Sequence, residues 1–327
     1  MRKLRIGIAG LGEFGELHTL VFSQLPYVEV RRVCSRTASR AEEIAAKYKV
    51  ASFCTDYNEL ATADDLDVIS VANFGKDHIK AVIPALNAGK HVLVEKPLAD
   101  SIEDAEAMVS AAKNARGKFM VAHICRFMPQ YYRAKELASA GKLGKIRLIQ
   151  TQRNNHYSTL SPGRKKNPLR ETAIHDIDLA LWIAGGRLES AYGYRQFNNS
   201  DREADCCLAT AKLDNGVICS FTSSWLRRDA QPAGVDARLD IIGSQGELHI
   251  KMPPDNLVFI NDHEHSHFNP ETALSPATIR QTALAAEIEY FLKCVMLDAP
   301  PDVITPEEAL ETLRTTIKID ESCIEIK

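Results

Sequence analysis

Apolar and polar positions alternate along the first part of the chain in two different rhythms. Short apolar runs predict buried strands at about residues 4–9, 28–34, 67–72, 91–94 and 118–122. The segments between these runs have the period of amphipathic helices, at about residues 13–25, 38–48, 78–88 and 102–114. Strands that alternate with helices in this way predict an α/β domain with a doubly wound parallel sheet over residues 1–122.

The rest of the chain follows a different pattern. A helix that ends near Gly141 and a strand at 145–152 lead to a helical segment that begins at Glu171. Strands are then expected at about 188–197, 204–213, 216–225, 235–243, 247–251 and 257–261, and two terminal helices at 276–297 and 306–324. Asp214-Asn-Gly216 is a strong hairpin signal. The pattern predicts an α+β domain over residues 123–327, with a large, mostly antiparallel open sheet and helices on one of its faces.

The first predicted strand is followed at once by glycines in a spacing that is typical of dinucleotide binding. The sequence reads Gly10-Leu11-Gly12-Glu13-Phe14-Gly15, between a strand and a helix. Gly10 permits the tight turn, Gly12 lets a pyrophosphate approach the backbone, and Gly15 packs the helix against the strand. The helix N-terminus adds N–H donors and a positive dipole for the phosphates. All residues of this loop are therefore expected to bind a dinucleotide cofactor.

The end of the second strand should decide between NAD and NADP. An acidic residue there would bind the ribose 2′-hydroxyl of NAD, but the sequence reads Cys34-Ser35-Arg36-Thr37. Ser35 can donate a hydrogen bond, and Arg36 can present a planar fork to a 2′-phosphate. We therefore expect both residues to contact the cofactor and NADP to be preferred over NAD. The alternative is a solvated Arg36 at the start of the next helix.

The strand predicted at 91–94 ends in two opposite charges, Glu95 and Lys96, before Pro97. Ligands bind at the carboxyl ends of the strands in open α/β sheets, so both charged residues are candidates for contact with cofactor and substrate. Asn73, at the end of the preceding strand, and His78, on the first turn of the following helix, are further candidate cofactor contacts. The alternatives are an ion pair that caps the sheet and a histidine that is merely packed or solvated.

The segment from Glu171 to Asp178 carries candidates for proton transfer. Glu171 and His175 are four residues apart on a predicted helix, and His175 and Asp178 are three apart, so each pair shares a face. A histidine beside carboxylates has the groups needed for general acid–base chemistry. For this segment alone, a core-facing histidine whose hydrogen bonds are satisfied by a neighbour is the favoured interpretation.

Composition narrows the functional class. At 327 residues the chain has room for two domains, and its net charge of −3 gives no electrostatic basis for binding nucleic acid or an anionic membrane. No apolar run approaches the ~18 residues needed to span a bilayer, and no signal peptide is expected ahead of the first strand. The eight cysteines form no CxxC pair, which favours reduced thiols in a cytoplasmic protein.

Three stretches together resemble the Gfo/Idh/MocA family, which comprises glucose–fructose oxidoreductase, inositol dehydrogenase and relatives that act on polyols and sugars. They are the glycine loop, Ala88-Gly-Lys-His-Val-Leu-Val-Glu-Lys-Pro97 and His123-Ile-Cys-Arg-Phe-Met-Pro129. The resemblance implies a Rossmann domain followed by an α+β domain, and a homodimer or homotetramer formed through the open face of the C-terminal sheet. It also implies that Lys96, His175 and Glu171 meet at the reacting carbon. Glu171 departs from the family's aspartate by one methylene.

The leading hypothesis is an NADP-preferring dehydrogenase or reductase of a cyclic polyol, sugar or related keto compound. His175 would accept the proton of the alcohol, Lys96 would hold the alcohol oxygen, and Glu171 would orient His175 or bind a neighbouring hydroxyl. The expected substrate contacts are Arg126, Asn155, His156 and Asp178. Two alternatives are a non-catalytic nucleotide-sensing protein on the same fold and a redox-assisted glycoside hydrolase that uses bound NAD without net oxidation.

Two further segments have an open interpretation. Arg164-Lys165-Lys166 is a basic group in a predicted loop, and it is either solvated surface or part of a rim over the active-site cleft. In His263-Glu-His-Ser-His267, alternate histidines on an extended segment would share a side and could hold zinc. Hydride transfer needs no metal, so we expect none.

Overall fold

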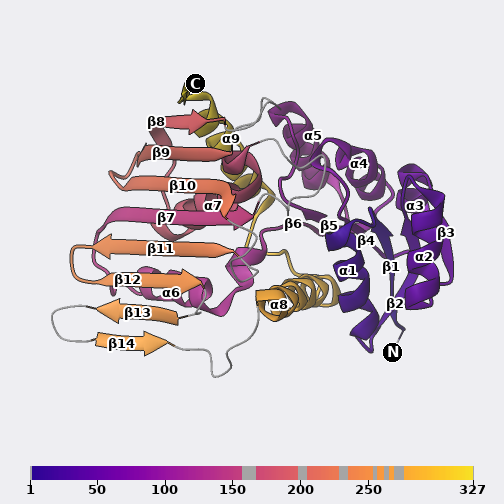
Figure 1. The fold of residues 1–327 in the computed structure, drawn as a ribbon. Helices are drawn as coiled ribbons and strands as arrows, with labels where there is room; N and C mark the ends of the chain where they lie inside the picture. The colour runs from indigo at the N-terminus through magenta and orange to yellow at the C-terminus, as the bar shows by residue number, and fades with distance from the viewer. Residues whose placement is uncertain are drawn as a thin grey trace. The chain divides into compact units, whose positions relative to one another are not determined.

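The computed structural model describes residues 2–156, 167–197, 205–227, 235–252, 256–260, 265–268 and 276–326 (Figure 1). The chain divides into two compact units. The first comprises Met1–Ile124 with Gln281–Leu310, and the second comprises Cys125–Arg280 with Glu311–Lys327. The division after Ile124 lies next to the boundary expected at residue 122, but Gln281–Leu310 groups with the first unit and not with the second domain as expected.

Two ion pairs connect the late segment to the rest of the first unit. The segment contains most of α8 (Pro276–Met296) and the turn that follows it. Lys118 Nζ lies 2.7 Å from a carboxylate oxygen of Asp298, and Lys113 Nζ lies 3.3 Å from one of Glu307. The amphipathic pattern of α8 indicates that the helix is buried on one side, but it carries no information on which sheet the helix covers.

The first unit contains a six-stranded parallel sheet in the order β3-β2-β1-β4-β5-β6. Its strands are β1 (Leu4–Ala9), β2 (Val28–Cys34), β3 (Ser52–Cys54), β4 (Val68–Val71), β5 (His91–Glu95) and β6 (Phe119–Ala122). The chain fills the sheet from β1 toward β3 and then returns to the other side of β1 with β4. This order confirms the predicted doubly wound sheet, to which the structure adds the short strand β3.

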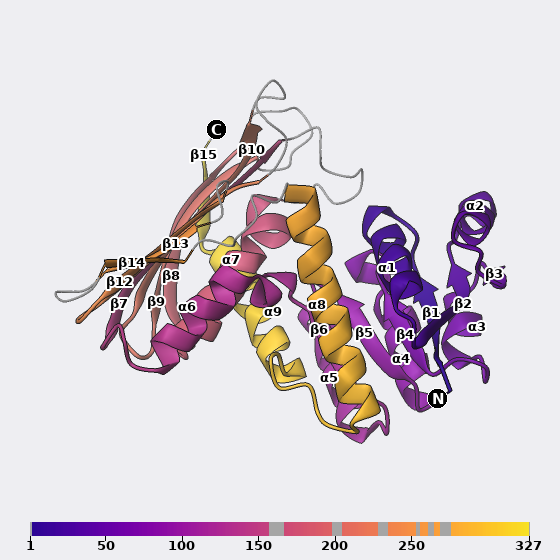
Figure 2. The same ribbon diagram turned by 90° about the horizontal axis from the view of Figure 1, so that it is seen from below.

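Helices cover both faces of this sheet. They are α1 (Glu13–Gln24), α2 (Ala38–Tyr48), α3 (Tyr57–Thr62), α4 (Ile79–Asn87) and α5 (Ile102–Asn114). Figure 2 shows α1 and α2 on one face and α3, α4 and α5 on the other. Because both faces are covered, every residue of β4 and β6 is buried. The short helix α3 was not predicted; the other four helices agree with the pattern to within about two residues.

The second unit contains a nine-stranded sheet in the order β14-β13-β12-β11-β7-β10-β9-β8-β15. Its strands are β7 (Ile146–His156), β8 (Leu188–Gln196), β9 (Cys206–Leu213), β10 (Ile218–Arg227), β11 (Asp236–Gly243), β12 (Glu247–Met252), β13 (Asn256–Ile260), β14 (His265–Phe268) and β15 (Cys323–Ile326). Two neighbouring pairs, β7 with β10 and β8 with β15, are parallel, and the others are antiparallel. The predicted mostly antiparallel open sheet is confirmed.

Three strand assignments differ from the predictions. β7 continues to His156, so the polar residues 153–156 lie within the strand and not beyond its end. The last predicted helix stops at Glu321, and Cys323–Ile326 pairs with β8 as a parallel edge strand. β14 was not predicted. Helices α6 (Pro129–Ser139), α7 (Ile174–Ala184) and most of α9 (Pro306–Glu321) lie against one face of the sheet (Figure 2).

Within the described part of the chain, no helix is both long enough and apolar enough to cross a membrane.

Candidate active site

In the loop between β1 and α1, two of the three glycines are packed against other backbone atoms, and the third has free space beside it. Gly10 has a φ of +89°, and a Cβ there would lie 2.4 Å from the backbone nitrogen of Asn73. A Cβ on Gly15 would lie 1.8 Å from the carbonyl oxygen of Gly10. A Cβ on Gly12, in contrast, would meet nothing within 4 Å. The open position is where the fingerprint requires a pyrophosphate to approach the backbone.

The amino end of α1 continues this site. Gly12 is the N-cap and makes no side-chain cap, and Glu13, Phe14 and Gly15 form the first turn. The positive end of the helix dipole therefore coincides with the open glycine. Leu11 is buried, and its carbonyl oxygen accepts a hydrogen bond from Arg40 Nε at 2.9 Å. The residues present fit the diphosphate of a dinucleotide.

A charged cluster that the sequence did not reveal holds α1 to α2 beside the loop. The Glu16 carboxylate accepts hydrogen bonds from Lys47 at 2.5 Å and from Tyr48 at 3.1 Å, and it pairs with Arg40. The Lys47 hydrogen bond, supported by Arg40 and Tyr48 and opposed by partial burial, lowers the pKa of Glu16 to about 2. Arg40 thus connects the glycine loop to this cluster.

Ser35 and Arg36 follow β2, and both have partners within the protein. Ser35 Oγ accepts a hydrogen bond at 3.2 Å from the backbone N–H two residues further on. The Arg36 guanidinium lies 3.4 Å from the buried carboxylate of Asp77 and 5.8 Å from the centre of the Phe74 ring. Lys80 binds the other oxygen of Asp77 at 2.7 Å. Arg36 is still 57% exposed, so its guanidinium is fixed beside the loop after β4 without being covered.

Asn73 and His78 lie close together after β4. Asn73 Nδ2 donates to the carbonyl oxygen of Asp77 at 3.2 Å, whereas its Oδ1 is buried without a hydrogen-bond partner among the described residues. His78 is fully buried, and its two ring nitrogens face the carbonyl oxygens of Leu98 at 3.0 Å and Asn73 at 3.2 Å. Burial lowers the pKa of His78, so the ring is neutral and donates to only one of them at a time.

The motif Glu95-Lys96-Pro97 stands at the carboxyl end of β5, on the same edge of the sheet as the glycine loop after β1. Glu95 is buried, and its carboxylate accepts a hydrogen bond from the Lys96 backbone N–H at 3.2 Å and lies 3.1 Å from His18 Nε2. The Lys96–Pro97 peptide bond is cis. Lys96 itself is half-buried.

Glu171 and His175 stand on either side of a change in helix type. Leu169–Ala173 forms a π-helix, and α7 continues from Ile174 as an α-helix. Trp225 Nε1 donates a hydrogen bond to Thr172 Oγ1 at 3.0 Å in the middle of the π-helical turn. Both Glu171 and His175 are half-buried. Short π-helical segments occur frequently at functional sites, and this one contains Glu171 and ends two residues before His175.

Two buried arginines hold the start of α7 in place. Arg153 of β7 binds Asp176 through Nε at 2.9 Å and Nη2 at 2.8 Å. Arg126 binds Asp178 through the same two nitrogens at 2.9 and 2.8 Å, and its guanidinium lies 5.2 Å from the centre of the Trp182 ring. Burial opposes the charge on Arg153, but the Asp176 carboxylate outweighs this effect and raises the pKa of Arg153.

Comparison with known proteins places both units in one family. Residues 4–123 match the model of the oxidoreductase family with an NAD-binding Rossmann fold, and residues 131–249 match the GFO/IDH/MocA C-terminal domain. The chain is 35% identical over 227 residues to 4-carboxy-2-hydroxymuconate-6-semialdehyde dehydrogenase of Sphingobium sp., covering 68% of this chain and 72% of the relative. The chain belongs to the Gfo/Idh/MocA family.

Further relatives agree with this membership. The chain is 25% identical to scyllo-inositol 2-dehydrogenase (NAD(+)) of Bacillus subtilis over 96% of this chain and 92% of the relative. A crystal structure of an oxidoreductase domain protein from Kribbella flavida has the same fold, with a TM-score of 0.88 at 22% identity over 98% of this chain and 97% of the other. As a Gfo/Idh/MocA protein with this Rossmann unit, the chain is a nicotinamide-dependent dehydrogenase.

Three of the predicted contacts are buried and have partners within the protein. Arg126 and Asp178, expected to contact substrate, are buried in a bidentate pair with one another, and Asp178 also accepts a hydrogen bond from Thr312 at 3.1 Å. His78, expected to contact the cofactor, has no exposed surface. The sequence pattern revealed the polar character of these residues but not their burial. Their contact with substrate or cofactor in this Gfo/Idh/MocA chain stays a prediction.

The other predicted substrate contacts lie near the end of β7. Asn155 is half-buried and His156 is buried. The Arg164–Lys166 group lies outside the described residues, as do His263 and the side chains of His265 and His267. Among the residues that are described, no cluster of histidine, cysteine or carboxylate side chains has the makings of a metal site.

Lys96 belongs to the first unit, and His175 and Glu171 belong to the second. That these three side chains meet at one reacting carbon therefore stays a prediction.

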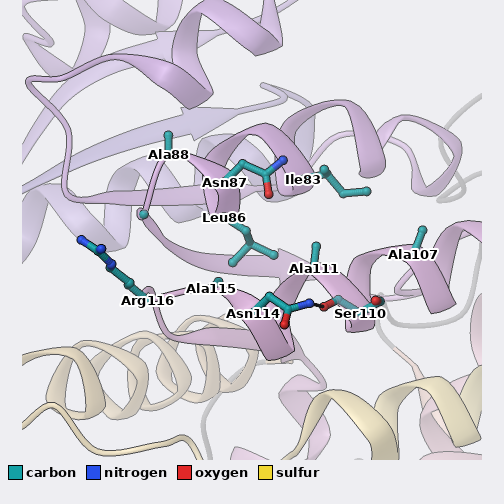
Figure 3. A pocket seen from close by; sticks show the side chains of 11 residues that line it. Ile83, Leu86, Asn87, Ala88, Ala107, Ser110, Ala111, Asn114, Ala115 and Arg116 are labelled. Carbon is teal, nitrogen blue, oxygen red and sulfur yellow. Dashed lines mark hydrogen bonds between the residues drawn. The ribbon is translucent and has the colours of Figure 1, made fainter.

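A groove of about 710 Å³ lies at the other end of β5, between α4 and α5 (Figure 3). Its lining includes Leu86, Gly89, Ala111 and Arg116. Gly89 precedes β5, whereas the motif follows it, so the groove opens at the amino ends of the strands. Open α/β sheets bind ligands at the opposite, carboxyl edge. The groove is accordingly separate from the glycine loop and from Lys96.

Proposed function

We propose that this protein transfers a hydride between a nicotinamide cofactor and a secondary alcohol or ketone of a cyclic polyol, a sugar or a related compound. The observation that carries the proposal is the position of Lys96: it follows a buried parallel strand, beside a buried carboxylate, at the sheet edge that also holds the open glycine. A lysine at that edge is within the region where a nicotinamide and a reacting alcohol would meet.

Each candidate residue has a separate task in the proposed reaction. When bound, the nicotinamide supplies the hydride acceptor or donor. Lys96 holds the alcohol oxygen and stabilises the negative charge that develops on it as the hydride leaves carbon. His175 takes the proton from that oxygen and returns it in the reverse direction, since imidazole exchanges protons near neutral pH. Glu171 orients His175 or binds a neighbouring hydroxyl of the substrate.

The preference for NADP is a further part of the proposal. No acidic residue ends β2, and the guanidinium of Arg36 lies next to the loop after β4, where the adenosine half of a dinucleotide passes. Asp77 competes for the same guanidinium, but Arg36 keeps more than half of its surface exposed to a 2′-phosphate. The Bacillus subtilis relative is named for NAD(+), and a solved structure of scyllo-inositol dehydrogenase from Lactobacillus casei contains bound NAD(H), so both cofactors belong in the assay.

The experiment that tests the proposal is a substrate panel. Purified protein is mixed with NAD⁺ or NADP⁺ and with myo-inositol, scyllo-inositol, glucose and other sugars, and reduced nicotinamide is followed by its absorbance. Accumulation of reduced cofactor with a cyclic polyol or sugar is the expected result. Turnover of a glycoside without net reduction of the cofactor would favour the redox-assisted hydrolase instead.

A second candidate substrate class is a carboxylated semialdehyde or diene diol. The relative with 35% identity is named for a carboxylated muconate semialdehyde, whereas the inositol dehydrogenases are 24–26% identical. Another relative at 29% identity, from Comamonas testosteroni, is named for a carboxylated cyclohexadiene diol. The panel therefore includes these two compounds, and faster turnover of either one than of any inositol would favour this class.

We propose that the protein is a homodimer or homotetramer that associates through the open face of its nine-stranded sheet. Ile324, Tyr194 and Leu208 are neighbours across β15, β8 and β9, and each is between 41% and 50% exposed. A continuous row of large apolar side chains on a sheet face favours association with a second copy. Leu208→Lys should lower the mass measured by light scattering, whereas Leu297→Lys, on a still more exposed leucine of the first unit, should not.

We also propose a cytoplasmic location. All eight cysteines are free thiols, and reduced thiols of this number are typical of a reducing compartment. Localisation of a tagged full-length chain by cell fractionation tests this, and recovery outside the cytoplasmic fraction would contradict it.

A further inference from the structure

A buried hydrogen-bonded chain connects the glycine-loop helix to the glutamate of the motif. His18, on α1, faces Ser70 of β4 through Nδ1 at 2.8 Å and Glu95 of β5 through Nε2 at 3.1 Å. His18 and Ser70 have no exposed surface, and Glu95 is 4% exposed. Ser70 pairs with Leu93 in the sheet, and Glu95 lies two residues beyond Leu93, so both side chains point to the face that α1 covers.

The chemistry of the three groups fixes how they bond. The Glu95 carboxylate can only accept, and it accepts the Lys96 backbone N–H through its other oxygen at 3.2 Å. With its proton on Nε2, His18 donates to Glu95 and accepts the Ser70 hydroxyl proton at Nδ1. Ser70 then donates to His18, and His18 donates to Glu95. The buried carboxylate thereby has a hydrogen-bond donor, which it needs because it is removed from water.

This arrangement contains a serine, a histidine and a carboxylate but is not a nucleophilic triad. The Ser70 hydroxyl is sealed in the core, so no substrate can reach it. The residue of this network that approaches the surface is Lys96, which is half-buried. What the network can transmit is therefore orientation: Glu95 cannot rotate without giving up His18, and the Lys96 backbone is tied to Glu95.

We propose that His18 is a positioning residue, which fixes the Glu95 carboxylate so that Lys96 is held in its working orientation. The inference rests on the proposed function, in which Lys96 acts on the alcohol oxygen. It assigns a role to a residue that lies outside the glycine fingerprint, one turn along the same helix. Loss of His18 should affect turnover more than cofactor binding, because the glycine loop itself is left intact.

The test compares three variants. His18→Leu should lower kcat about 30-fold while the Kd for NAD⁺ and NADP⁺ stays within about threefold. His18→Gln, whose amide can still donate toward Glu95, should recover most of the loss. Phe22→Leu is the matched control, because Phe22 lies on the same buried side of α1 with its ring 6.3 Å from that of His18 but has no hydrogen bond to the network. It should leave kcat nearly unchanged.

A second readout needs neither substrate nor cofactor. The Lys96 backbone N–H is protected by its bond to Glu95, so its hydrogen exchange, measured by NMR, should accelerate about tenfold or more in His18→Leu and not in Phe22→Leu. In a Glu95→Gln background, His18→Leu should add little, because residues that act in series are not additive. If His18→Leu does not fold, Ser70→Ala, which removes one bond of the network, serves in its place with a smaller effect in the same direction.

The outcomes separate this inference from the function on which it rests. Full activity in Lys96→Met would refute the proposed function. An inactive Lys96→Met together with unchanged kcat and unchanged Lys96 N–H exchange in His18→Leu would overturn the role of His18 alone. Equal losses in His18→Leu and Phe22→Leu would also overturn it, since they would reduce His18 to ordinary core packing.

Discussion

The glycine-loop edge of the first unit and the start of α7 in the second unit are built in opposite ways. At the glycine loop, position is set by the backbone: Gly10 and Gly15 are glycines because a Cβ would collide with main-chain atoms. At α7, position is set by side chains that come from far along the sequence, Arg153 to Asp176 and Arg126 to Asp178. A site made of backbone leaves a local signature, whereas a site made of paired side chains does not.

This difference also decides what each region can tolerate. Removal of one partner from a buried ion pair leaves an uncompensated charge, which is more costly than the loss of the bond itself. The glycine loop is held in part by hydrogen bonds to uncharged backbone oxygens. Gly10 N–H donates to the Cys34 carbonyl oxygen at 2.9 Å, and Arg40 donates to the carbonyl oxygen of Leu11. We therefore expect the loss of a buried ion pair at α7 to lower the free energy of unfolding more than a change beside the glycine loop.

The largest effect is expected for Arg153→Met, which leaves Asp176 buried without its counter-ion. We expect the free energy of unfolding to fall by roughly 3–5 kcal/mol, measured by urea denaturation. Arg153→Met combined with Asp176→Leu should recover much of this loss, because the second change removes the stranded charge. Lys212→Met breaks an exposed pair with Glu189, 2.6 Å apart, and should change stability little. A loss in Arg153→Met no larger than in Lys212→Met would contradict the contrast drawn between the regions.

The second prediction concerns the two residues that the proposed reaction needs from the two regions. Lys96→Met keeps the bulk of the side chain but removes its charge, and His175→Asn keeps polarity but removes the titratable group. Each should lower kcat by roughly 10²-fold or more with cofactor affinity within a few-fold. The double variant should be little worse than the poorer single variant, because the two act as a unit. Additive losses would mean that Lys96 and His175 do not serve the same proton and oxygen.

The same contrast explains what could be predicted from the sequence. The parallel sheet, the glycine loop and the motif at the end of β5 were predicted because spacing and periodicity encode them locally. The burial of Arg126, Asp178 and His78 was missed, because a charged or polar residue has the same appearance in a sequence whether its partner is water or a distant side chain. His18 was missed for a related reason: a lone histidine on the apolar side of a helix carries no sign of the carboxylate 77 residues further on.

The third prediction concerns the choice between NADP and NAD. In contrast to the position of the glycine loop, this choice should depend on a side chain and not on the backbone. Arg36→Ala should weaken NADP binding by about 1.5–3 kcal/mol and NAD binding much less, since only NADP offers a phosphate to the guanidinium. Isothermal titration with each cofactor measures both. Asp77→Asn is the complementary variant, because it releases Arg36 from its ion pair at 3.4 Å and should favour NADP further. A wild type that binds NAD more tightly would refute the assignment.

The smallest effect is expected from pH, at the cluster that supports the glycine loop. The folded-state pKa of Glu16 is lowered to about 2, chiefly by Lys47, from an ordinary value of 4.5. A carboxyl group whose pKa is depressed by folding stabilises the native state above its unfolded pKa, and this contribution is lost as the pH falls from about 4.5 to about 2. Because the cluster is partly exposed to solvent, we expect on the order of 1 kcal/mol and not the full value of the shift. Unfolding measured from pH 6 to pH 2 for the wild type and for Glu16→Gln should give curves that converge toward the acid end. A constant difference in the free energy of unfolding across that range would show that Glu16 stabilises the protein through packing alone. The charges of the cluster beside the glycine loop would then contribute nothing to stability.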